Sequence, residues 1–533
     1  MSMRRIVLAG LTLIVIVLSV GPALLSSLEQ QQISGRLELY QTDLMLQAQE
    51  LATEEGSATQ LRQAIMGKSP LDGAIEQYRS VRQEMTQHLE DVDGASRGQA
   101  SGETDDAPLD SVEPTAPSVA PAAPPQATLD AVDQQQFLNR IDLRLGILYA
   151  EADNLDMARD RWQTVASAGQ AAPATDGQAQ TAAVLSGLWR DPPQLLPDAE
   201  AQIQRSLQGW FQTRALNQLY SLQQRGDAVN TLAAAEQELA QQSVIKLGLL
   251  GIGPAFGGVI GVGLLIFLGV QRIFQGKTSL LAETNQRSWT TPWTWEITWQ
   301  VLIVGFFFIG QIVLPLILVF ARFLIINPLI DSSAAAAAAG GRISAVSTLV
   351  AYLLLALSSI GVLYLSIRTY RPLPEDWFKL KITSRWPLWG LGGYFAAVPL
   401  VIGVSVINQQ LWQGRGGSNP LLQIVLNETD PVALGLFFFT AAVAAPIFEE
   451  CLFRGFLLPS LTRYMAVWPA ITLSAFIFAA AHLSVSEILP LMVLGIVLGF
   501  VYTRSRSLLA PMLVHSLWNS ATMMGLLILG SVE

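Results

Sequence analysis

Cysteine, histidine and charged side chains are scarce in this chain of 533 residues. Cys451 is its single cysteine, which excludes an intrachain disulfide and a thiolate metal cluster. Only 14% of the residues are charged and 51% are hydrophobic, so the chain is too apolar to be one soluble globule. Its net charge of −10 comes mostly from the first half and argues against nucleic acid as a partner. The composition therefore predicts a multi-pass membrane protein.

Long apolar runs, without the strict alternation of strands, predict an all-α fold. A helix needs about 20 apolar residues to cross the hydrocarbon core of a membrane. The sequence has about nine runs that approach this length, so we expect a polytopic helical membrane protein. The predicted spans are 6–26, 247–270, 296–320, 346–367, 387–408, 431–453, 468–483, 488–503 and 508–530.

Residues 1–27 contain the first expected span. Arg4 and Arg5 precede it, as in a signal peptide, but the apolar run is too long and no clear cleavage site of small residues follows. We interpret it as an uncleaved membrane anchor. Because Lys and Arg favour the cytoplasmic side, and the other basic loops fall on that same side, we expect a cytoplasmic N-terminus in the bacterial inner (cell) membrane. Residues 27–246 are then expected outside the cytoplasm.

The part of the chain between the first two spans divides into three. Residues 28–93 are rich in Gln, Leu and Glu and have a helical pattern. Residues 94–130 are rich in Pro, Ala, Ser and Asp, cannot bury a core, and are expected to form a disordered linker. Residues 131–246 are helical in pattern again. Residues 247–384 add transmembrane helices before a last domain at 385–533.

One stretch within 131–246 has the spacing of a tetratricopeptide helix pair. The matching residues are Leu145, Gly146 and Tyr149 on the first helix and Ala158 and Trp162 on the second. The alternative is an ordinary amphipathic hairpin with these aromatic residues in its core, because such repeats normally need at least three copies. In either form, this TPR-like module suggests contact with a protein partner.

Three polar clusters interrupt the membrane helices near the end of the chain. They read Glu449-Glu450-x-x-x-Arg454, Phe478-x-x-x-His482 and His515-x-x-x-Asn519. Two of the three histidines of the chain lie in these clusters. Ionisable groups at membrane depth cost about 3 kcal/mol or more each, so they are rare there without a partner or a function. The clusters are therefore the candidate functional site.

The two glutamates of the first cluster have different expected roles. Glu450 and Arg454 are four residues apart, the spacing at which an acid and a base share a helix face and pair. Adjacent residues point about 100° apart on a helix, so Glu449 remains as the carboxylate that faces the site. A partly desolvated carboxylate suits a general base near neutral pH. The alternative, an ion pair that only locks a helix end, explains Glu450 and Arg454 but not Glu449.

The two histidine clusters lie on the last helices. The predicted spans 468–483 and 488–503, at and after His482, have about 16 residues each, or about 24 Å. This is shorter than the hydrocarbon core of about 30 Å, so His482 could lie within the bilayer near Glu449. His515 and Asn519 share one helix face, and their N–H groups could stabilise an oxyanion. The alternatives are a packing role for His482 and an ordinary interhelical contact for the other two.

Together, the three motifs in this order resemble the CPBP family, the CAAX prenyl proteases and bacteriocin-processing enzymes, also called the ABI family of intramembrane endopeptidases. The resemblance covers about residues 385–530. It implies a membrane-embedded peptidase cavity that substrate enters between the helices. It also implies the roles of the site residues: Glu449 as the general base that activates water, His482 as a residue that orients this water, His515 and Asn519 as oxyanion ligands, and Glu450 and Arg454 as supporting residues.

The expected mechanism needs no metal. Zinc is the alternative cofactor, with Glu449, His482 and His515 as its three ligands and one open position. The family has been described both as metalloproteases and as glutamate-dependent peptidases, but the His-Glu-x-x-His helix of common zinc peptidases is absent from this sequence. A cysteine-protease role for Cys451 is disfavoured, because two positions along a helix it points away from Glu449.

The expected partners are the lipid bilayer, a peptide or membrane-protein substrate, and a protein that binds the outer helical module. A rival hypothesis is a non-catalytic membrane scaffold or transporter whose intramembrane charges form an ion path. A third is immunity to a peptide toxin, by binding or by cleavage. Nothing in the sequence separates this third hypothesis from protein maturation. The scaffold hypothesis is favoured if Glu449 or His515 is dispensable while the outer helical module is essential.

Overall fold

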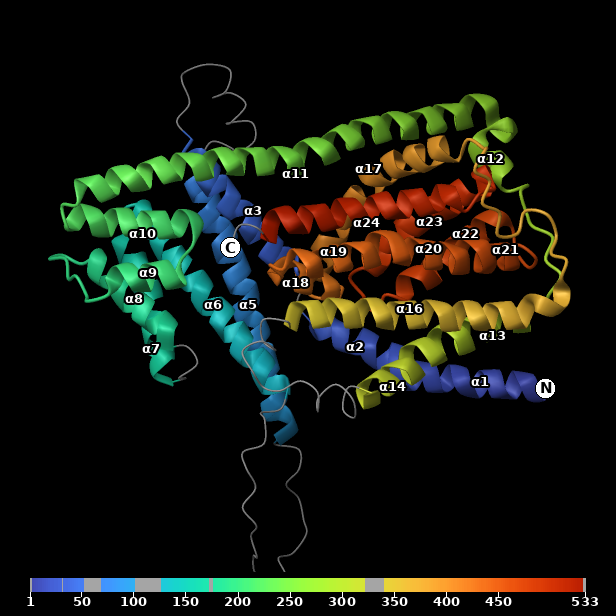
Figure 1. Ribbon diagram of the computed structural model, residues 1–533, viewed down its shortest axis with the longest axis horizontal. Coiled ribbons are helices and arrows are strands. Elements are labelled where there is room, and N and C mark those ends of the chain that lie inside the picture. The colour runs from blue at the N-terminus through green and yellow to red at the C-terminus, as the bar shows by residue number, and fades with distance from the viewer. Residues whose placement is uncertain are drawn as a thin grey trace, which may run out of the picture. The chain divides into compact units, whose positions relative to one another are not determined.

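The computed structural model describes residues 2–30, 32–51, 69–100, 126–171, 176–321 and 340–530, and every regular element within these ranges is a helix. Contacts between residues divide the chain into two compact units. The first, here called the membrane unit, comprises Met1–Ser34 and Leu249–Ser531. The second, here called the helical module, is formed by Gly35–Gly248. Figure 1 labels the helices of both units. The prediction of an all-α fold is confirmed.

Eight helices of the described residues are long and apolar enough to cross a membrane. A further apolar helix, α22 (Val467–Ala480), has only 14 residues, or about 21 Å, and corresponds to the predicted span 468–483. The chain is therefore an integral, multi-pass membrane protein. The eight spans are Met3–Leu28, Gly226–Thr278, Trp295–Ala321, Gly340–Tyr370, Trp386–Trp412, Pro431–Leu461, Ile488–Ser505 and Leu509–Gly530.

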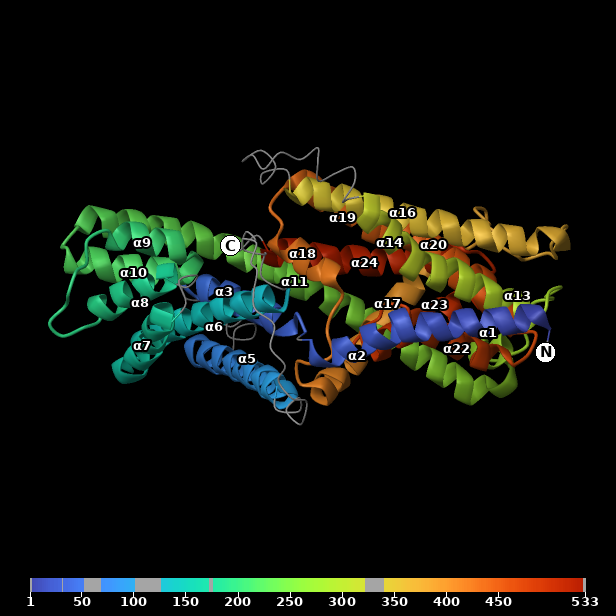
Figure 2. The same cartoon turned by 90° about the horizontal axis from the view of Figure 1, so that it is seen from below.

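The membrane unit is a bundle in which α16, α20, α23 and α24 run side by side (Figures 1 and 2). Its first helices are α1 (Met3–Val15), η1 (Ile16–Val20) and α2 (Gly21–Glu29). After α11 (Gly226–Gln275), which begins in the helical module, come η3 (Gly276–Thr278), α12 (Leu280–Thr284), α13 (Trp295–Gln300), η4 (Val301–Val313), α14 (Leu314–Ala321), α16 (Gly340–Ile367), η6 (Arg368–Tyr370) and α17 (Trp386–Trp412). The last are α18 (Pro420–Asn427), α19 (Pro431–Phe439), η7 (Thr440–Ala444), α20 (Ala445–Glu449), η8 (Glu450–Leu457), α21 (Leu458–Leu461), α22, α23 (Ile488–Ser505) and α24 (Leu509–Gly530).

Large apolar side chains cover the outside of this bundle. Ile6, Val17, Phe256 and Leu357 are between 54% and 68% exposed. Contiguous apolar surface of this kind is rare on a soluble monomer. It is expected where the surrounding solvent is the hydrocarbon of a bilayer, in which only closed helical backbones are satisfied.

A loop before α13 fixes the end of the span Pro431–Leu461. Trp293 is fully buried, and its Nε1 donates a hydrogen bond to Ser460 Oγ at 3.0 Å. The backbone N–H of Trp289 donates to Thr462 Oγ1 at 3.1 Å. Because buried polar groups are stable only when they are hydrogen-bonded, these bonds hold the end of the span in one position.

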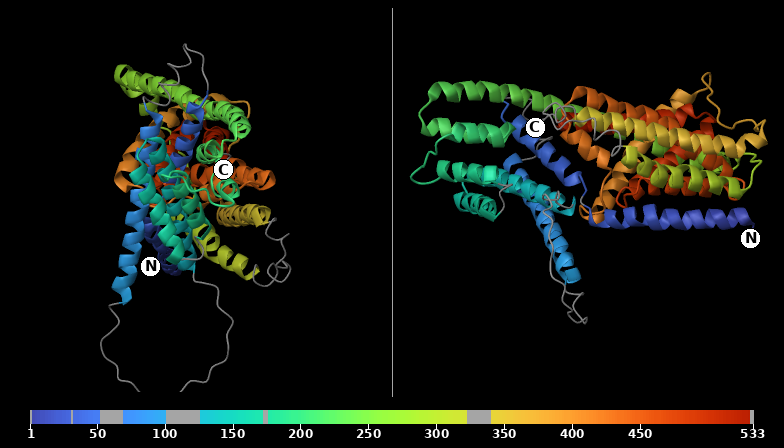
Figure 3. Two further views of the ribbon diagram at one scale, coloured as in Figure 1. Left: turned by 90° about the vertical axis from the view of Figure 1, so that its left-hand side faces the viewer. Right: turned by 60° about the horizontal axis from the view of Figure 1, so that its bottom comes forward.

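The helical module is built of successive helices that pack against their neighbours (Figure 3). They are α3 (Ser34–Gln49), α5 (Pro70–Ala100), α6 (Gln126–Glu151), α7 (Leu155–Ala171), α8 (Asp176–Leu188), α9 (Ala199–Ser206), α10 (Gly209–Leu222) and the first part of α11. Helices α5 and α6 extend into the predicted linker 94–130 from both ends. The remaining linker residues, 101–125, lie outside the described residues.

The predicted hairpin of this module is formed by α6 and α7. Trp162 is fully buried, and its Nε1 donates to the Leu143 carbonyl at 3.2 Å. A Cβ at Gly146 would lie 2.2 Å from that nitrogen, so only glycine lets the two helices approach this closely. The contact accounts for the Gly146 and Trp162 spacing, while assignment to the tetratricopeptide class stays a prediction.

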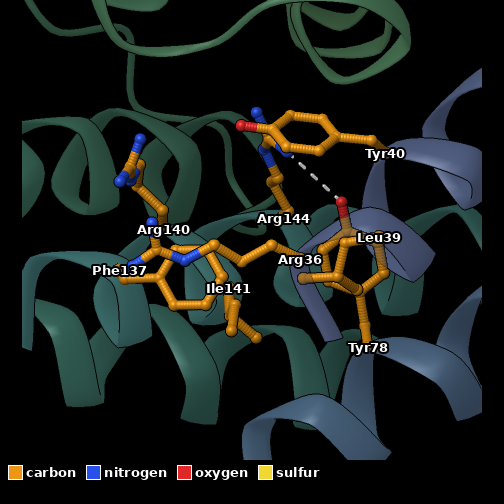
Figure 4. A pocket seen from close by; sticks show the side chains of 8 residues that line it. All are labelled: Arg36, Leu39, Tyr40, Tyr78, Phe137, Arg140, Ile141 and Arg144. Carbon is orange, nitrogen blue, oxygen red and sulfur yellow. Dashed lines mark hydrogen bonds between the residues drawn. The ribbon is translucent and has the colours of Figure 1, made fainter. Parts of the chain in front are cut away.

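A small pocket between α3, α5 and α6 is lined by arginine and aromatic side chains (Figure 4). The Arg36 guanidinium lies 4.5 Å above the centre of the Phe137 ring. Arg144 Nη1 is 2.8 Å from Asp43 Oδ2, and Tyr78 OH donates to Asp43 Oδ1 at 2.5 Å. Burial and the Asp43 carboxylate raise the pKa of Tyr78 well above its ordinary value, so its hydroxyl stays a donor. These polar bonds join three helices of the module.

Candidate active site

The span that carries the two glutamates is not a regular α-helix. Within Pro431–Leu461, the segments η7 and η8 have the wider hydrogen-bonding pattern of a π-helix. Single π turns inside α-helices are frequent at functional sites. Glu449 is the last residue of α20 and Glu450 is the first of η8. The two glutamates therefore lie where the helix type changes.

Two backbone carbonyls of this span lack their usual donors. Pro446 has no N–H, so it cannot bond the carbonyl of Ala442, four residues earlier. The N–H of Ala445 bonds the carbonyl of Thr440, five residues earlier, and so leaves the carbonyl of Ala441 free. Unsatisfied backbone groups are costly inside a bilayer, and side chains of neighbouring helices commonly satisfy those that a proline frees.

Helix α24 supplies both missing donors. Ser516 Oγ donates to the Ala442 carbonyl at 2.6 Å, and Asn519 Nδ2 donates to the Ala441 carbonyl at 2.7 Å. These bonds fix α24 against the span that carries the glutamates. Since His515 is adjacent to Ser516, they also bring its imidazole to the glutamates.

Glu450 and Arg454 form a buried ion pair. Arg454 Nη1 lies 2.8 Å from Glu450 Oε1, and the two side chains are 1% and 0% exposed. Arg454 Nη2 also donates to the Gly495 carbonyl at 3.3 Å, and its guanidinium lies 4.4 Å above the centre of the Phe478 ring. The pairing predicted from the four-residue spacing is confirmed.

The imidazole of His515 lies between the two glutamates. Its Nδ1 is 2.9 Å from Glu450 Oε1, and its Nε2 is 3.9 Å from Glu449 Oε2. An ionised carboxylate only accepts hydrogen bonds, so Nδ1 is the donor to Glu450. The distance from Nε2 to Glu449 is too long for a direct hydrogen bond, but a single small molecule such as water can contact both atoms.

Glu449 differs from Glu450 in forming no ion pair with an Arg or Lys side chain of the described residues. Its Oε1 accepts a hydrogen bond from Tyr352 OH at 2.9 Å. Its Oε2 is buried, faces His515 and accepts no hydrogen bond from the described residues. Burying a carboxylate oxygen without a partner is unfavourable, so this atom is a candidate site for a water molecule.

Tyr352 is a site residue that the sequence analysis missed. It lies on α16, which the motifs do not include, and 97 residues separate it from Glu449. A tyrosine in an apolar helix carries no motif and usually indicates packing or an interface. Only the tertiary contact identifies its hydroxyl as a ligand of the Glu449 carboxylate.

Phe478 connects His482 to the rest of the site. The Phe478 ring centre lies 5.0 Å from that of His482 and 5.7 Å from that of His515. Within the described residues, His482 forms no ion pair with Glu449 or Glu450, and its Nδ1 lies 2.9 Å from the Phe478 carbonyl. The phenylalanine of the second motif thus packs against both histidines, whereas the sequence analysis considered only His482.

Glu487 is a further carboxylate close to His482. It lies between α22 and α23, and its Oε1 accepts a hydrogen bond from the backbone N–H of Asn419 at 2.7 Å. Burial raises the pKa of Glu487, and this hydrogen bond and the nearby His482 oppose that rise. Glu487 belongs to none of the three motifs, so the sequence analysis did not group it with the site.

The structure thus brings the predicted residues together to different degrees. Glu449, Glu450, Arg454 and His515 form one connected cluster of polar contacts. His482 is linked to this cluster through the Phe478 ring, which packs against both histidines. Asn519 is linked to it by its hydrogen bond to the Ala441 carbonyl. The interhelical contact considered for Asn519 is present, and its amide keeps a second N–H as a donor. The catalytic roles stay predictions.

Zinc, the alternative cofactor with Glu449, His482 and His515 as ligands, stays a prediction. Zinc needs three protein ligands at about 2 Å from one point. Among the described residues, no group of three or more His, Cys, Asp or Glu side chains is placed to hold a metal ion. In the alternative ligand set, Nδ1 of His515 is bonded to Glu450 and Nδ1 of His482 lies against a backbone carbonyl, so Nε2 is the nitrogen of each ring that a metal would contact. Cys451 packs against the apolar core instead of either histidine.

A family model and a curated relative each match part of this chain. Residues 431–521 match the family model described as Type II CAAX prenyl endopeptidase Rce1-like. The curated relative is "Putative membrane peptidase YdiL" of Bacillus subtilis (strain 168), with 24% identity over 133 residues, which are 25% of this chain. The match spans 53%, about half, of the length of that relative. No solved structure matches the chain.

Proposed function

We propose that this protein is an intramembrane endopeptidase in which Glu449 activates the water that hydrolyses the peptide bond. The match of residues 431–521 supports a membrane endopeptidase at the level of the family. The observation that supports Glu449 as the base is the set of contacts made by its two carboxylate oxygens. Tyr352 holds one oxygen, while the other is buried, has no partner among the described residues and faces His515.

The proposed reaction starts with a water molecule between Glu449 Oε2 and His515 Nε2. Glu449 takes a proton from this water, and the resulting hydroxide attacks the carbonyl carbon of the substrate. The carbonyl electrons move to oxygen and form an oxyanion. When the intermediate collapses, the C–N bond breaks, and the leaving amine receives the proton that Glu449 had taken.

The oxyanion is proposed to bind His515 and Asn519. Asn519 uses one N–H for the Ala441 carbonyl and has a second for this purpose. His515 already donates from Nδ1, so it must also carry a proton on Nε2 when it acts as an oxyanion ligand. Preorganised donors in a site with little water stabilise developing charge more than water does. We assign His482 to orienting the attacking water, as the order of the motifs implies.

The direct test is cleavage by the purified protein. The detergent-solubilised full chain is incubated with a membrane-protein fraction, and new peptide termini are identified by mass spectrometry. We expect termini that appear with the wild type and do not appear with Glu449→Gln. Exhaustive chelation should leave this cleavage unchanged, because no step uses a metal. Loss of cleavage on chelation and its recovery with added zinc would contradict the proposed mechanism.

Removal of the Tyr352 hydroxyl is expected to lower kcat about 10- to 100-fold with little change in KM. Hydrogen bonds to charged groups contribute about 1.5–3 kcal/mol, and this one orients the base without touching the substrate. The measurement compares Tyr352→Phe with Tyr364→Phe, a change to an exposed tyrosine on the same helix. Equal kcat for Tyr352→Phe and the wild type would exclude a positioning role for the hydroxyl.

The oxyanion proposal predicts that His515→Ala and Asn519→Ala each lower kcat about 10²–10³-fold. Ser516→Ala is the matched control, because it also removes a bond from α24 to a freed carbonyl but no proposed oxyanion donor. We expect Asn519→Ala and Ser516→Ala to lower the melting temperature by similar amounts, and Asn519→Ala to lower kcat at least about tenfold more than Ser516→Ala does. Equal loss of activity in both variants would assign Asn519 to helix docking alone.

The proposed topology places the N-terminus in the cytoplasm and residues 27–246 outside it, where the helical module would contact a substrate or a protein partner. The Lys and Arg bias of the loops supports this orientation. A protease added to the outer face of spheroplasts should cleave the helical module. Cleavage from the cytoplasmic face only would reverse the orientation.

A further inference from the structure

An apolar groove with a volume of about 450 Å³ lies in the membrane unit. It is lined by residues from α11, α12, α17, α22 and α23. None of the residues of the three motifs lines it. The volume falls within the range of about 300–1,000 Å³ that is typical of ligand pockets.

The groove lies beside a close contact between the backbones of α11 and α17. Small side chains of α17 leave space in it. A Cβ at Gly261 of α11 would lie only 1.9 Å from the carbonyl oxygen of Phe395, so the two backbones are in contact there. Close approach of membrane helices through small residues is common. Gly392 and Ala396, which precede and follow Phe395 on α17, line the groove together with Leu264 of α11.

The lining of the groove includes one positive charge and two indole rings. Arg385, which immediately precedes α17, is the one charged residue in the lining and is exposed. Trp389 and Trp468 line the same groove. Tryptophan is enriched at the interface between the hydrocarbon core and the headgroups, and basic pockets between membrane helices bind anionic headgroups.

The length of the groove suits one acyl chain. From Arg385 to Leu400, both of which line it, α17 advances 15 residues, or about 22 Å at 1.5 Å per residue. Half of a bilayer core of about 30 Å is about 15 Å, so the groove is long enough for the hydrocarbon of one leaflet. A peptide in the same place would leave its backbone N–H and C=O groups without partners in an apolar lining.

We propose that this groove binds an anionic glycerophospholipid of the surrounding bilayer. One acyl chain lies between α11 and α17, and the phosphate contacts the Arg385 guanidinium. The headgroup lies at the level of Trp389 and Trp468. The site is independent of peptide hydrolysis, and binding is measured without reference to it.

Native mass spectrometry of the detergent-solubilised full chain, titrated with phosphatidylglycerol or phosphatidylcholine of identical acyl chains, tests the proposal. We expect about fivefold tighter binding of phosphatidylglycerol, from one basic contact at the headgroup. Arg385→Gln should remove this preference and keep the weaker binding of both lipids. The matched control is Arg368→Gln, a change to an exposed arginine that does not line the groove.

A second variant fills the groove without disturbing the helix packing. A Cβ at Gly392 or at Gly403, both on α17, would meet no atom within 4 Å, but only Gly392 lines the groove. Gly392→Phe should weaken binding of both lipids about tenfold or more, and Gly403→Phe should bind as the wild type does. Equal binding of the two lipids by the wild type, or unchanged binding by Gly392→Phe at an unchanged melting temperature, would overturn the proposal.

Discussion

Glu449→Gln is expected to lower kcat about 10²–10⁴-fold, the usual contribution of a positioned general base, while the protein stays folded. The amide has nearly the volume of the carboxylate and can still accept the bond from Tyr352 OH, but it cannot take a proton from water. Peptide cleavage and the melting temperature of the detergent-solubilised variant are measured together.

The neighbouring carboxylate provides the comparison for this variant. Glu450→Gln leaves the Arg454 charge without its buried partner, so its main effect is expected on stability. Normal cleavage by Glu449→Gln, together with a folded and inactive Glu450→Gln, would reverse the roles of the two glutamates.

Arg454→Ala is expected to destabilise the membrane unit by about 3–5 kcal/mol, the cost of leaving one charge of a buried pair uncompensated. The Glu450 carboxylate is completely buried, and its remaining polar contact is with His515. The variant also loses the bond to the Gly495 carbonyl and the packing on Phe478. The melting temperature and the amount of folded protein in membranes measure the effect.

A double replacement separates lost packing from unpaired charge. Glu450→Leu combined with Arg454→Met removes both charges and keeps apolar volume, so it should be more stable than Arg454→Ala. A melting temperature of Arg454→Ala equal to that of the wild type would show that the ion pair contributes nothing to the fold.

Local spacing predicted the parts of the site that lie on one helix. The four-residue separation of Glu450 and Arg454 gave their ion pair, because residues at this spacing share a helix face. The lengths of the apolar runs likewise predicted the spans, including the short one at 468–483 that corresponds to α22. Both predictions depend on the period and rise of a single helix, which the sequence determines directly.

Contacts between helices could not be derived in the same way. Pro446 removes a backbone donor from its helix, and nothing in the sequence identifies Ser516 of another helix as the donor that replaces it. The hydroxyl of Tyr352 reaches Glu449 from a helix without any motif. The zinc alternative had chemically suitable ligands in Glu449, His482 and His515, but ligand type does not reveal which atoms converge.

The most direct test of the central claim is a comparison of protein termini in cells that carry the wild type or Glu449→Ala. Membrane proteins from both strains are analysed by mass spectrometry for new N- and C-termini, at matched abundance of the two variants. The account predicts a defined set of termini that disappears with Glu449→Ala and returns when the wild type is restored. Identical termini in the two strains would contradict it and favour a non-catalytic scaffold.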